Sequence, residues 1–203
     1  MGRVQPTKAE LRAEILASRR AVLAEVRAAE TAALSGHLAA IARSGETLCA
    51  YAPVGSEPGS LSMLDAVRAL GVTVLLPVAR EDAAGTPLPL RWGEYRGTLV
   101  DARFGLREPP EPWLPPDGIA GASIVVVPAL AVDLAGVRLG RGAGFYDRTL
   151  GLADPSARLV AMVRDDELRD WLPGEPHDVA MTHVLTPTQG LVGLGGRGPA
   201  RGE

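Results

Sequence analysis

A cluster of glycines and arginines directly follows the most apolar segment of the chain. Residues 123–132 form an almost uninterrupted apolar run, and residues 136–148 then contain four glycines, three arginines and Asp147. This order is typical of a buried strand that leads into a glycine-rich turn, and we expect a helix to begin near Phe145. Glycine lets the backbone approach an anion closely, and the free N–H groups at a helix start point towards it. The sequence therefore predicts a phosphate-binding loop that directly follows a central strand.

Known phosphate-binding patterns fit this stretch poorly. No Gly-Lys-Ser/Thr follows the glycines, so the Walker pattern is excluded. The spacing of Gly140, Gly142 and Gly144 also fails the dinucleotide pattern, whose third glycine stands one place later. From composition alone, a flexible hairpin with solvated arginines remains an alternative.

A longer match distinguishes these alternatives. The string RLGRGAGFYDR, residues 138–148, closely resembles the signature of the 5-formyltetrahydrofolate cyclo-ligase family, also called methenyltetrahydrofolate synthetase. That signature reads approximately RLGxGxGYYDR. This chain departs from it at Phe145, where the family more often has tyrosine, and Ala143 stands where the family varies.

The resemblance implies an activity. Cyclo-ligases use ATP to convert 5-formyltetrahydrofolate into 5,10-methenyltetrahydrofolate, with release of ADP and phosphate. The family reaction proceeds by phosphorylation of the N5-formyl oxygen, attack of N10 and departure of phosphate. Such chemistry depends on alignment and charge neutralisation rather than on a protein nucleophile. The implied partners are a reduced folate, ATP and Mg²⁺.

Two alternatives of other classes stay open. A paralogue that kept the phosphate loop but lost turnover would be a folate- or nucleotide-binding module. Phe145 and Thr182, which stands where the family tends to carry an aspartate, make this alternative conceivable. A different ATP-dependent ligase or kinase on the same scaffold is the second alternative.

The amino-terminal helix carries two basic residues on one face. Lys8 and Arg12 stand four residues apart, on a helix that Thr7 and Glu10 can cap. Composition alone favours a solvated basic face. However, Lys8-Ala9-Glu10-Leu11-Arg12 matches a Lys-x-x-Leu-Arg element that binds ATP in cyclo-ligases. We expect the later arginines of this helix to face solvent: Arg19, Arg20 and Arg27.

A loop after an early strand carries the expected substrate contact. Residues 48–52 read as a buried strand, and residues 53–60 follow as a loop with one carboxylate, Glu57. Glu57 alone would be an ordinary exposed glutamate. The family has a glutamate here that contacts the folate, and a carboxylate can accept from the amino and ring N–H groups of a pterin.

The resemblance also assigns the remaining site residues. Asp147 and Asp178 are expected near Mg²⁺, and His177 beside Asp178 is either a supporting partner or a loop residue of no consequence. The acidic run 165–170 is expected to be a solvated helix start rather than a metal site. The residues expected to act in catalysis are Arg141, Tyr146 and Arg148. Those expected to bind ATP are Lys8, Arg12, Arg138, Leu139, Gly140, Arg141, Gly142, Ala143, Gly144, Phe145 and Tyr146. Those expected to bind the substrate are Ala52, Glu57, Gly142 and Tyr146.

The order of apolar segments predicts an α/β fold. Helical patterns are expected over residues 8–29, 31–44 and 61–70, and strands over 48–52, 73–79, 88–92, 123–132 and 159–163. This order favours an open, mostly parallel sheet with helices on both faces, a Rossmann-like three-layer arrangement, with an antiparallel extension. We expect one domain over residues 1–192 and a disordered glycine-rich tail over 193–203.

Charge and cysteine content exclude several classes of protein. A net charge of −3 argues against a nucleic-acid-binding surface, and no apolar run approaches the length of a membrane span. The beginning of the chain lacks the apolar core of a secretory signal. The lone Cys49 is expected in the core and fits a reducing cytoplasm. We therefore expect a cytoplasmic monomer that binds neither nucleic acid nor membrane.

Overall fold

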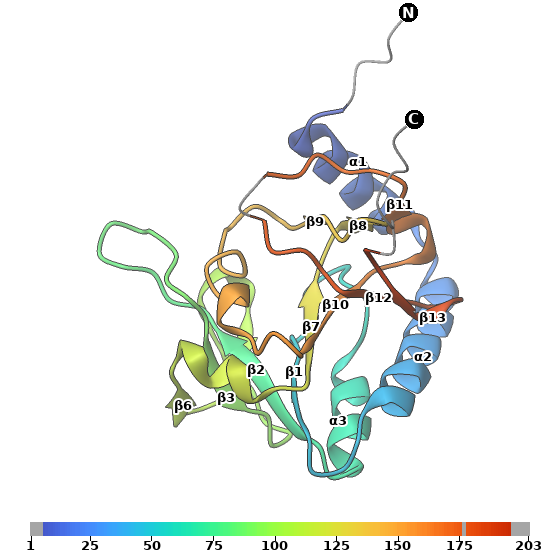
Figure 1. Ribbon diagram of the computed structural model, residues 1–203. Coiled ribbons are helices and arrows are strands. Elements are labelled where there is room, and N and C mark those ends of the chain that lie inside the picture. Colours follow the sequence, from blue (N-terminus) through green and yellow to red (C-terminus); the bar gives the residue numbers. More distant parts are fainter. Residues whose placement is uncertain (1–5, 176–177, 196–203) are drawn as a thin grey trace, which may run out of the picture.

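A mostly parallel sheet forms the centre of the protein (Figure 1). The computed structural model describes residues 6–175 and 178–195. In this part of the chain the sheet has eight strands in the order β13-β12-β10-β7-β1-β2-β3-β6, of which β12, β10, β7, β1 and β2 run parallel. The strands are β1 (Thr47–Cys49), β2 (Thr73–Val78), β3 (Arg91–Glu94), β6 (Trp113–Leu114), β7 (Ile124–Pro128), β10 (Arg158–Met162), β12 (His183–Thr186) and β13 (Gly190–Gly193). The antiparallel strands β13, β3 and β6 extend the sheet at its two edges. The predicted fold class is confirmed.

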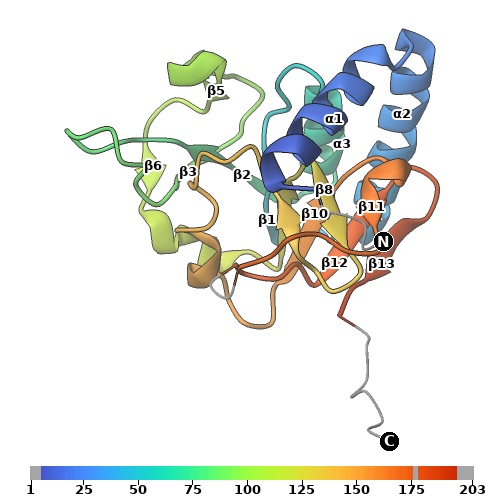
Figure 2. The ribbon, with the colours of Figure 1, turned by 90° about the horizontal axis from the view of Figure 1, so that it is seen from above.

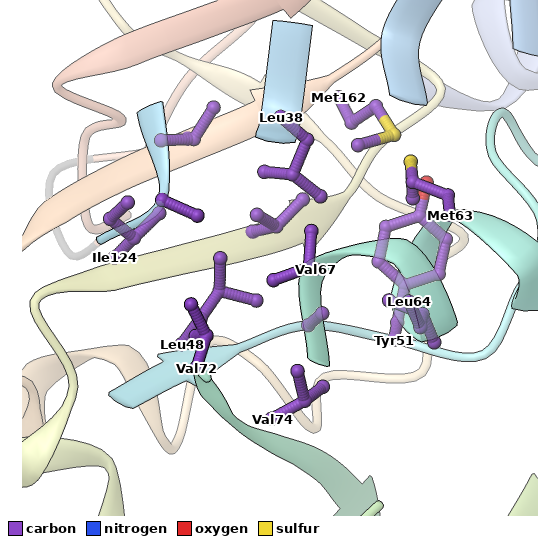
Figure 3. Close-up of a cluster of buried hydrophobic side chains, with 14 of the residues drawn as sticks. Leu38, Leu48, Tyr51, Met63, Leu64, Val67, Val72, Val74, Ile124 and Met162 are labelled. Carbon is purple, nitrogen blue, oxygen red and sulfur yellow. The ribbon is translucent and has the colours of Figure 1, made fainter. Parts of the chain in front are cut away.

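Side chains of the central strands alternate between the two faces of the sheet, so the interior has one core on each face. Successive side chains of a strand point to opposite faces of a sheet. In β7, Ile124 and Val126 belong to one buried cluster, whereas Val125 and Val127 belong to the other. The first cluster lies between the sheet and the helices α2 (Ala24–Ile41) and α3 (Leu61–Ala69), as Figure 3 shows. The apolar run of β7 is therefore a strand that is buried on both faces.

The two faces of the sheet are covered differently. The α-helices α2 and α3 pack against each other on one face. The short 3₁₀ helices η2 (Pro116–Gly121) and η3 (Leu150–Leu152) contribute Ile119 and Leu150 to the cluster on the other face. The remaining 3₁₀ helices are η1 (Arg103–Gly105) and η4 (Asp165–Glu167).

Helix α1 (Lys8–Ala21) lies across the end of the sheet towards which β7 points (Figures 1 and 2). There it packs on a small sheet of order β11-β8-β9, formed by β8 (Ala131–Asp133), β9 (Arg138–Leu139) and β11 (Leu168–Arg169). Its buried residues Leu11 and Ile15 contact Leu130 and Leu139 in a third cluster. The predicted capping box of Thr7 and Glu10 begins the helix.

The predicted boundaries of the first two helices were wrong. The first helix ends at Ala21 instead of continuing to residue 29, because Val22 and Leu23 are extended, and α2 then runs from Ala24 to Ile41 rather than over 31–44.

The helix predicted from Phe145 does not form. Residues 145–149 are turns, followed by η3. The Thr149 hydroxyl donates to the Phe145 carbonyl and also accepts from Leu90 N–H, so a side chain replaces regular helical bonding here.

The order of the central strands creates a switch point. From β1 the chain continues through α3 to its neighbour β2, whereas from β7 it leads to β10 on the opposite side. The loops that follow β1 and β7 therefore diverge at the carboxyl edge of the sheet. In open α/β sheets this is where ligands bind.

The carboxyl-terminal part of the described chain remains close to the domain. Strand β13 ends at Gly193, and Gly195 N–H donates to the Leu134 carbonyl. The rest of the predicted tail, residues 196–203, lies outside the described residues, as does His177. Within the described residues, no helix combines the length and apolar character needed to span a bilayer.

Candidate active site

A cavity of about 470 Å³ lies at the switch point, between the loops that follow β1 and β7. Tyr51 and Ala52 come from the first loop, Ala129 and Leu130 come from the second, and Pro128 is the last residue of β7. Many of the predicted site residues line this cavity: Ala52, Glu57, Arg138, Gly140, Arg141, Gly142, Ala143, Gly144, Phe145, Tyr146 and Asp147.

The glycine-rich loop presents free donors. Within the described residues, the backbone N–H groups of Arg141, Gly142, Ala143 and Gly144 donate to no other group of the protein. Gly142 and Gly144 have φ of +97° and +80°, conformations that favour glycine. Successive unpaired amides beside a cavity form a site for an anion. These amides form the site although the helix predicted to begin near Phe145 does not form.

Arg12 of α1 lies against this loop. Its Nε donates to the Gly140 carbonyl at 2.9 Å. A Cβ atom on residue 142 would lie 3.4 Å from the Arg12 guanidinium carbon, so glycine at 142 leaves room for that side chain. Helix α1 thus brings one predicted nucleotide-binding residue to the anion site, although Arg12 does not line the cavity itself.

Lys8 lies one turn earlier on α1 and has different partners. Its Nζ is 2.8 Å from Glu175 Oε1 and 3.6 Å from Asp178 Oδ2. The hydrogen bond to Glu175 is the main cause that raises the pKa of Lys8. Asp178 therefore faces a lysine, and neither Lys8 nor Asp178 lines the cavity.

An ion pair in the cavity wall joins the loop that follows β1 to the glycine-rich loop, and both loops carry predicted ligand contacts. Glu57 Oε1 lies 3.1 Å from Arg141 Nε, and Glu57 Oε2 accepts from Val54 N–H at 2.9 Å. The Glu57 side chain is 12% exposed, whereas that of Arg141 is 49% exposed. The carboxylate is therefore fixed in the wall, and the arginine reaches over from the glycine-rich loop.

Arg138 organises the adjoining wall. Its Nη2 contacts Asp147 Oδ1 at 2.6 Å, and its guanidinium lies 5.7 Å from the centroid of the Tyr146 ring. The Tyr146 hydroxyl is buried and has no hydrogen-bond partner among the residues that the structure describes. Burial raises the pKa of Tyr146, and the nearby Glu57 carboxylate raises it further. A buried orphan donor that lines a cavity is available to a ligand.

The structure does not bring every predicted residue to the cavity. Leu139 is buried beneath α1, where it supports the loop through packing. Arg148 is exposed and does not line the cavity. In the described part of the chain, no group of three or more His, Cys, Asp or Glu side chains could by itself hold a metal ion.

Arg19 was wrongly predicted to face solvent. Its side chain is 1% exposed and forms a bidentate ion pair with Glu167, which belongs to the acidic run that was expected to be solvated. Arg19 also lines the cavity. The sequence did contain a signal, since Arg19 follows Leu11 and Ile15 at intervals of four residues and so shares their buried face.

Comparisons with known proteins identify the family of this chain. The family described as the 5-formyltetrahydrofolate cyclo-ligase family matches residues 4–187, which include both α1 and the glycine-rich loop. The chain belongs to the 5-formyltetrahydrofolate cyclo-ligase family. A 5-formyltetrahydrofolate cyclo-ligase of Mycolicibacterium smegmatis is 62% identical over 189 residues, 93% of this chain and 97% of that protein. The cyclo-ligase of Escherichia coli is 28% identical over 144 residues, 70% of this chain and 79% of that protein.

Solved structures share the cyclo-ligase fold. The 5,10-methenyltetrahydrofolate synthetase of Aquifex aeolicus superposes with a TM-score of 0.74 at 22% identity, covering 97% of this chain and 96% of that one. The synthetase of Mycoplasma pneumoniae superposes with a TM-score of 0.68 at 17% identity, covering 88% of this chain and 98% of that one.

Proposed function

We propose that this cyclo-ligase converts 5-formyltetrahydrofolate into 5,10-methenyltetrahydrofolate with consumption of ATP and release of ADP and phosphate. The formyl oxygen is phosphorylated first, N10 then attacks the activated carbon, and phosphate leaves. The observation that carries this proposal is the row of unpaired amides at residues 141–144, which open beside a cavity that also holds the Glu57 carboxylate.

Anion binding by the glycine-rich loop supplies the phosphate side of the reaction. Amides that are already oriented stabilise a transferring phosphoryl group without reorganisation during the reaction. Arg12, Arg138 and Arg141 surround the same loop and add charge-assisted donors. Lys8, at the start of α1, is assigned to the outer nucleotide phosphates. It must exchange Glu175 for the nucleotide.

The folate side of the reaction depends on Glu57 and Tyr146. Glu57 accepts hydrogen bonds from the amino and ring N–H groups of the pterin, and its 12% exposure keeps those bonds out of bulk water. The orphan Tyr146 hydroxyl donates to the substrate or to a phosphate oxygen. Both groups therefore act by positioning the formyl oxygen next to the phosphoryl group.

The residues at the loop fit a magnesium ion that nucleotide phosphates help to hold. Mg²⁺ in such sites binds through one or two carboxylates, several waters and the phosphates rather than through an all-protein cage. Asp147 lines the cavity beside the free amides and would be its carboxylate ligand. When bound, the ion neutralises phosphate charge. Asp178 fits less well because it does not line the cavity. Each carboxylate has a cation that must move before it can act as a ligand: Arg138 is 2.6 Å from Asp147, and Lys8 is 3.6 Å from Asp178.

We also propose that the protein acts as a cytoplasmic monomer. The lone cysteine, Cys49, is a buried free thiol, which suits a reducing compartment.

The test is an absorbance assay for 5,10-methenyltetrahydrofolate with purified protein, with and without ATP and Mg²⁺. The expected result is product formation only when both are present. Calorimetric binding of 5-formyltetrahydrofolate without product formation would instead identify a folate-binding module. Absence of folate binding, together with ATP turnover on another acceptor, would indicate a different ligase on this scaffold.

A further inference from the structure

Arg19 has one donor group that the fold does not use. Its Nε and Nη2 bind the Glu167 carboxylate, and Nη2 also donates to the Ala129 carbonyl. Nη1 is buried and has no hydrogen-bond partner within the described part of the chain. A buried donor without a partner lowers the stability of the folded protein, and a ligand in the cavity can provide the missing acceptor.

The contacts of Nη2 determine where Nη1 points. The N–H groups of a guanidinium lie in one plane, and Nη1 and Nη2 share one edge of it. Because Glu167 takes the Nη2 donor beside Nε, the Nη2 donor that Ala129 accepts lies on the edge shared with Nη1. One Nη1 donor is therefore parallel to this bond and points towards the same side. Arg19 and Ala129 both line the cavity of the site.

Arg19 also lies beside the carboxylate that is assigned to the pterin. Arg19 and Glu57 line both the cavity of the site and a second cavity of about 20 Å³, and no other described residue lines the two. They therefore form part of the wall between them. Burial lowers the pKa of Arg19, but Glu167 outweighs burial, so the pKa is raised, with smaller contributions from Tyr51 and Glu57. Next to Glu57 there is thus a permanent cation, which donates and never accepts.

A pterin requires such a donor, an argument that rests on the proposed function. Glu57 accepts from the ring N3–H and from the 2-amino group, which leaves the adjacent ring oxygen, O4, as an acceptor. A carbonyl oxygen that is buried without a donor loses its hydrogen bond to water and weakens binding. We propose that Arg19 Nη1 donates to O4 of the pterin, so that Arg19 and Glu57 together select a folate by its C4=O and N3–H groups.

The Tyr146 hydroxyl is a second unpaired donor on the same cavity. A phenol hydroxyl rotates about its C–O bond and either donates or accepts. Arg19, by contrast, is held by three hydrogen bonds and only donates. Arg19 is therefore the group that distinguishes an oxygen acceptor from another substituent at C4, and Tyr146 is the rival donor that the test must separate from it.

The test compares 5-formyltetrahydrofolate with its 4-thio analogue, in which sulfur replaces O4. The analogue keeps N3–H and the 2-amino group for Glu57, but a thiocarbonyl sulfur is a weaker acceptor than oxygen. The proteins are the wild type, the double variant Arg19→Met/Glu167→Leu, Tyr146→Phe and the exposed control Arg20→Met. Calorimetry gives the two dissociation constants on each protein. Their ratio is the readout, because a general loosening of the site weakens both ligands alike.

The wild type should bind the oxygen ligand roughly tenfold more tightly than the thio analogue, as expected for a hydrogen bond from a charged donor. In the double variant the two ligands should bind with similar affinity. The wild-type ratio should persist in Tyr146→Phe and in Arg20→Met. Equal binding of both ligands by the wild type overturns the proposal. A preference that persists in the double variant also overturns it, because the preference then comes from the size of sulfur, and so does a preference that disappears in Tyr146→Phe.

A crystal structure of the wild type with the folate decides the contact without any substitution, whether or not the double variant folds. Nη1 should lie within about 3.2 Å of O4. A structure in which Nη1 instead binds a water molecule in the 20 Å³ cavity overturns the proposal. Folate binding without turnover overturns the proposed function, while the affinity ratio still decides the role of Arg19. Absence of folate binding to the wild type overturns both.

Discussion

Arg19 and Glu167 form a bidentate ion pair inside the protein: Nε lies 2.6 Å from Oε1, and Nη2 lies 2.8 Å from Oε2. The two side chains are only 1% and 3% exposed. Arg19 Nη2 also donates to the Ala129 carbonyl at 2.7 Å, in the loop that lines the cavity. The pair therefore ties helix α1, which carries Lys8 and Arg12, to the wall of the site.

Substitution of one member of the Arg19–Glu167 pair should strongly lower the free energy of unfolding, whereas substitution of both should lower it much less. Arg19→Met leaves the Glu167 carboxylate buried without its cation, and we expect the free energy of unfolding to fall by roughly 3–5 kcal/mol. The double variant Arg19→Met/Glu167→Leu should recover most of that loss. Urea unfolding of the two variants and of the exposed control Arg20→Met checks this. A double variant no more stable than Arg19→Met would contradict it.

Tyr146→Phe should separate stability from activity. The hydroxyl is buried and has no partner within the described part of the chain, so its removal should leave the unfolding free energy unchanged or raise it by about 1 kcal/mol. Turnover should fall because the ligand loses that donor. Thermal unfolding and kcat/KM are the measurements. Destabilisation with unchanged turnover would show that the hydroxyl serves the fold.

Asp147→Asn should abolish most of the activity without affecting the fold. The Asp147 side chain is 45% exposed, whereas that of Arg138 is only 8% exposed, so a weaker contact between them should cost about 1–3 kcal/mol of stability and leave the protein folded. Loss of the carboxylate should lower kcat on the order of 10²-fold at a fixed Mg²⁺ concentration.

Asp65→Asn is the matched control for that variant, since Asp65 is 48% exposed and also contacts an arginine, Arg68 at 3.7 Å, but lies on α3 away from the cavity. Normal Mg²⁺-dependent turnover in Asp147→Asn would remove Asp147 from the metal site.

Cys49 should be unreactive in the native protein. Burial raises the pKa of its thiol well above the ordinary value, and the thiolate is the reactive form. At pH 8 we expect no reaction of the folded protein with a disulfide reagent and one equivalent of reaction in urea. Because the chain has one cysteine, the result is unambiguous. Rapid modification of the folded protein would show that the strand opens locally.

The central strands and the loops of the site were predictable from short-range patterns. The apolar run of β7 and the glycines at 140–144 are local features, and their order indicated a strand followed by a glycine-rich turn. The choice between an anion-binding loop and a flexible hairpin depended on the longer match over residues 138–148. The helix predicted over residues 61–70 does begin directly after Ser60, whose hydroxyl oxygen accepts from Met63 N–H. Short-range patterns suffice where the neighbours along the chain determine the conformation.

Features that depend on distant contacts were not predictable in this way. Arg19 pairs with a residue 148 positions away, and a buried arginine reads like a solvated one until its partner is known. The turn at residues 145–149 depends on Thr149 contacting Leu90 from another part of the chain. Likewise, the pattern Val22-Leu23 reads as helical, whereas packing of α1 against the small sheet and of α2 against α3 requires a break there.

The contact between Glu57 and Arg141 has a thermodynamic consequence. Under the function that we propose, a nucleotide that draws Arg141 towards its phosphates would release Glu57 for the pterin, and a folate that occupies Glu57 would release Arg141 for the nucleotide. Each ligand then breaks the Glu57–Arg141 ion pair, so the second ligand binds without having to break it. By reciprocity, the factor by which one ligand tightens the other must be the same in both directions. A single bond between two loops is thus enough to make the two substrates cooperate.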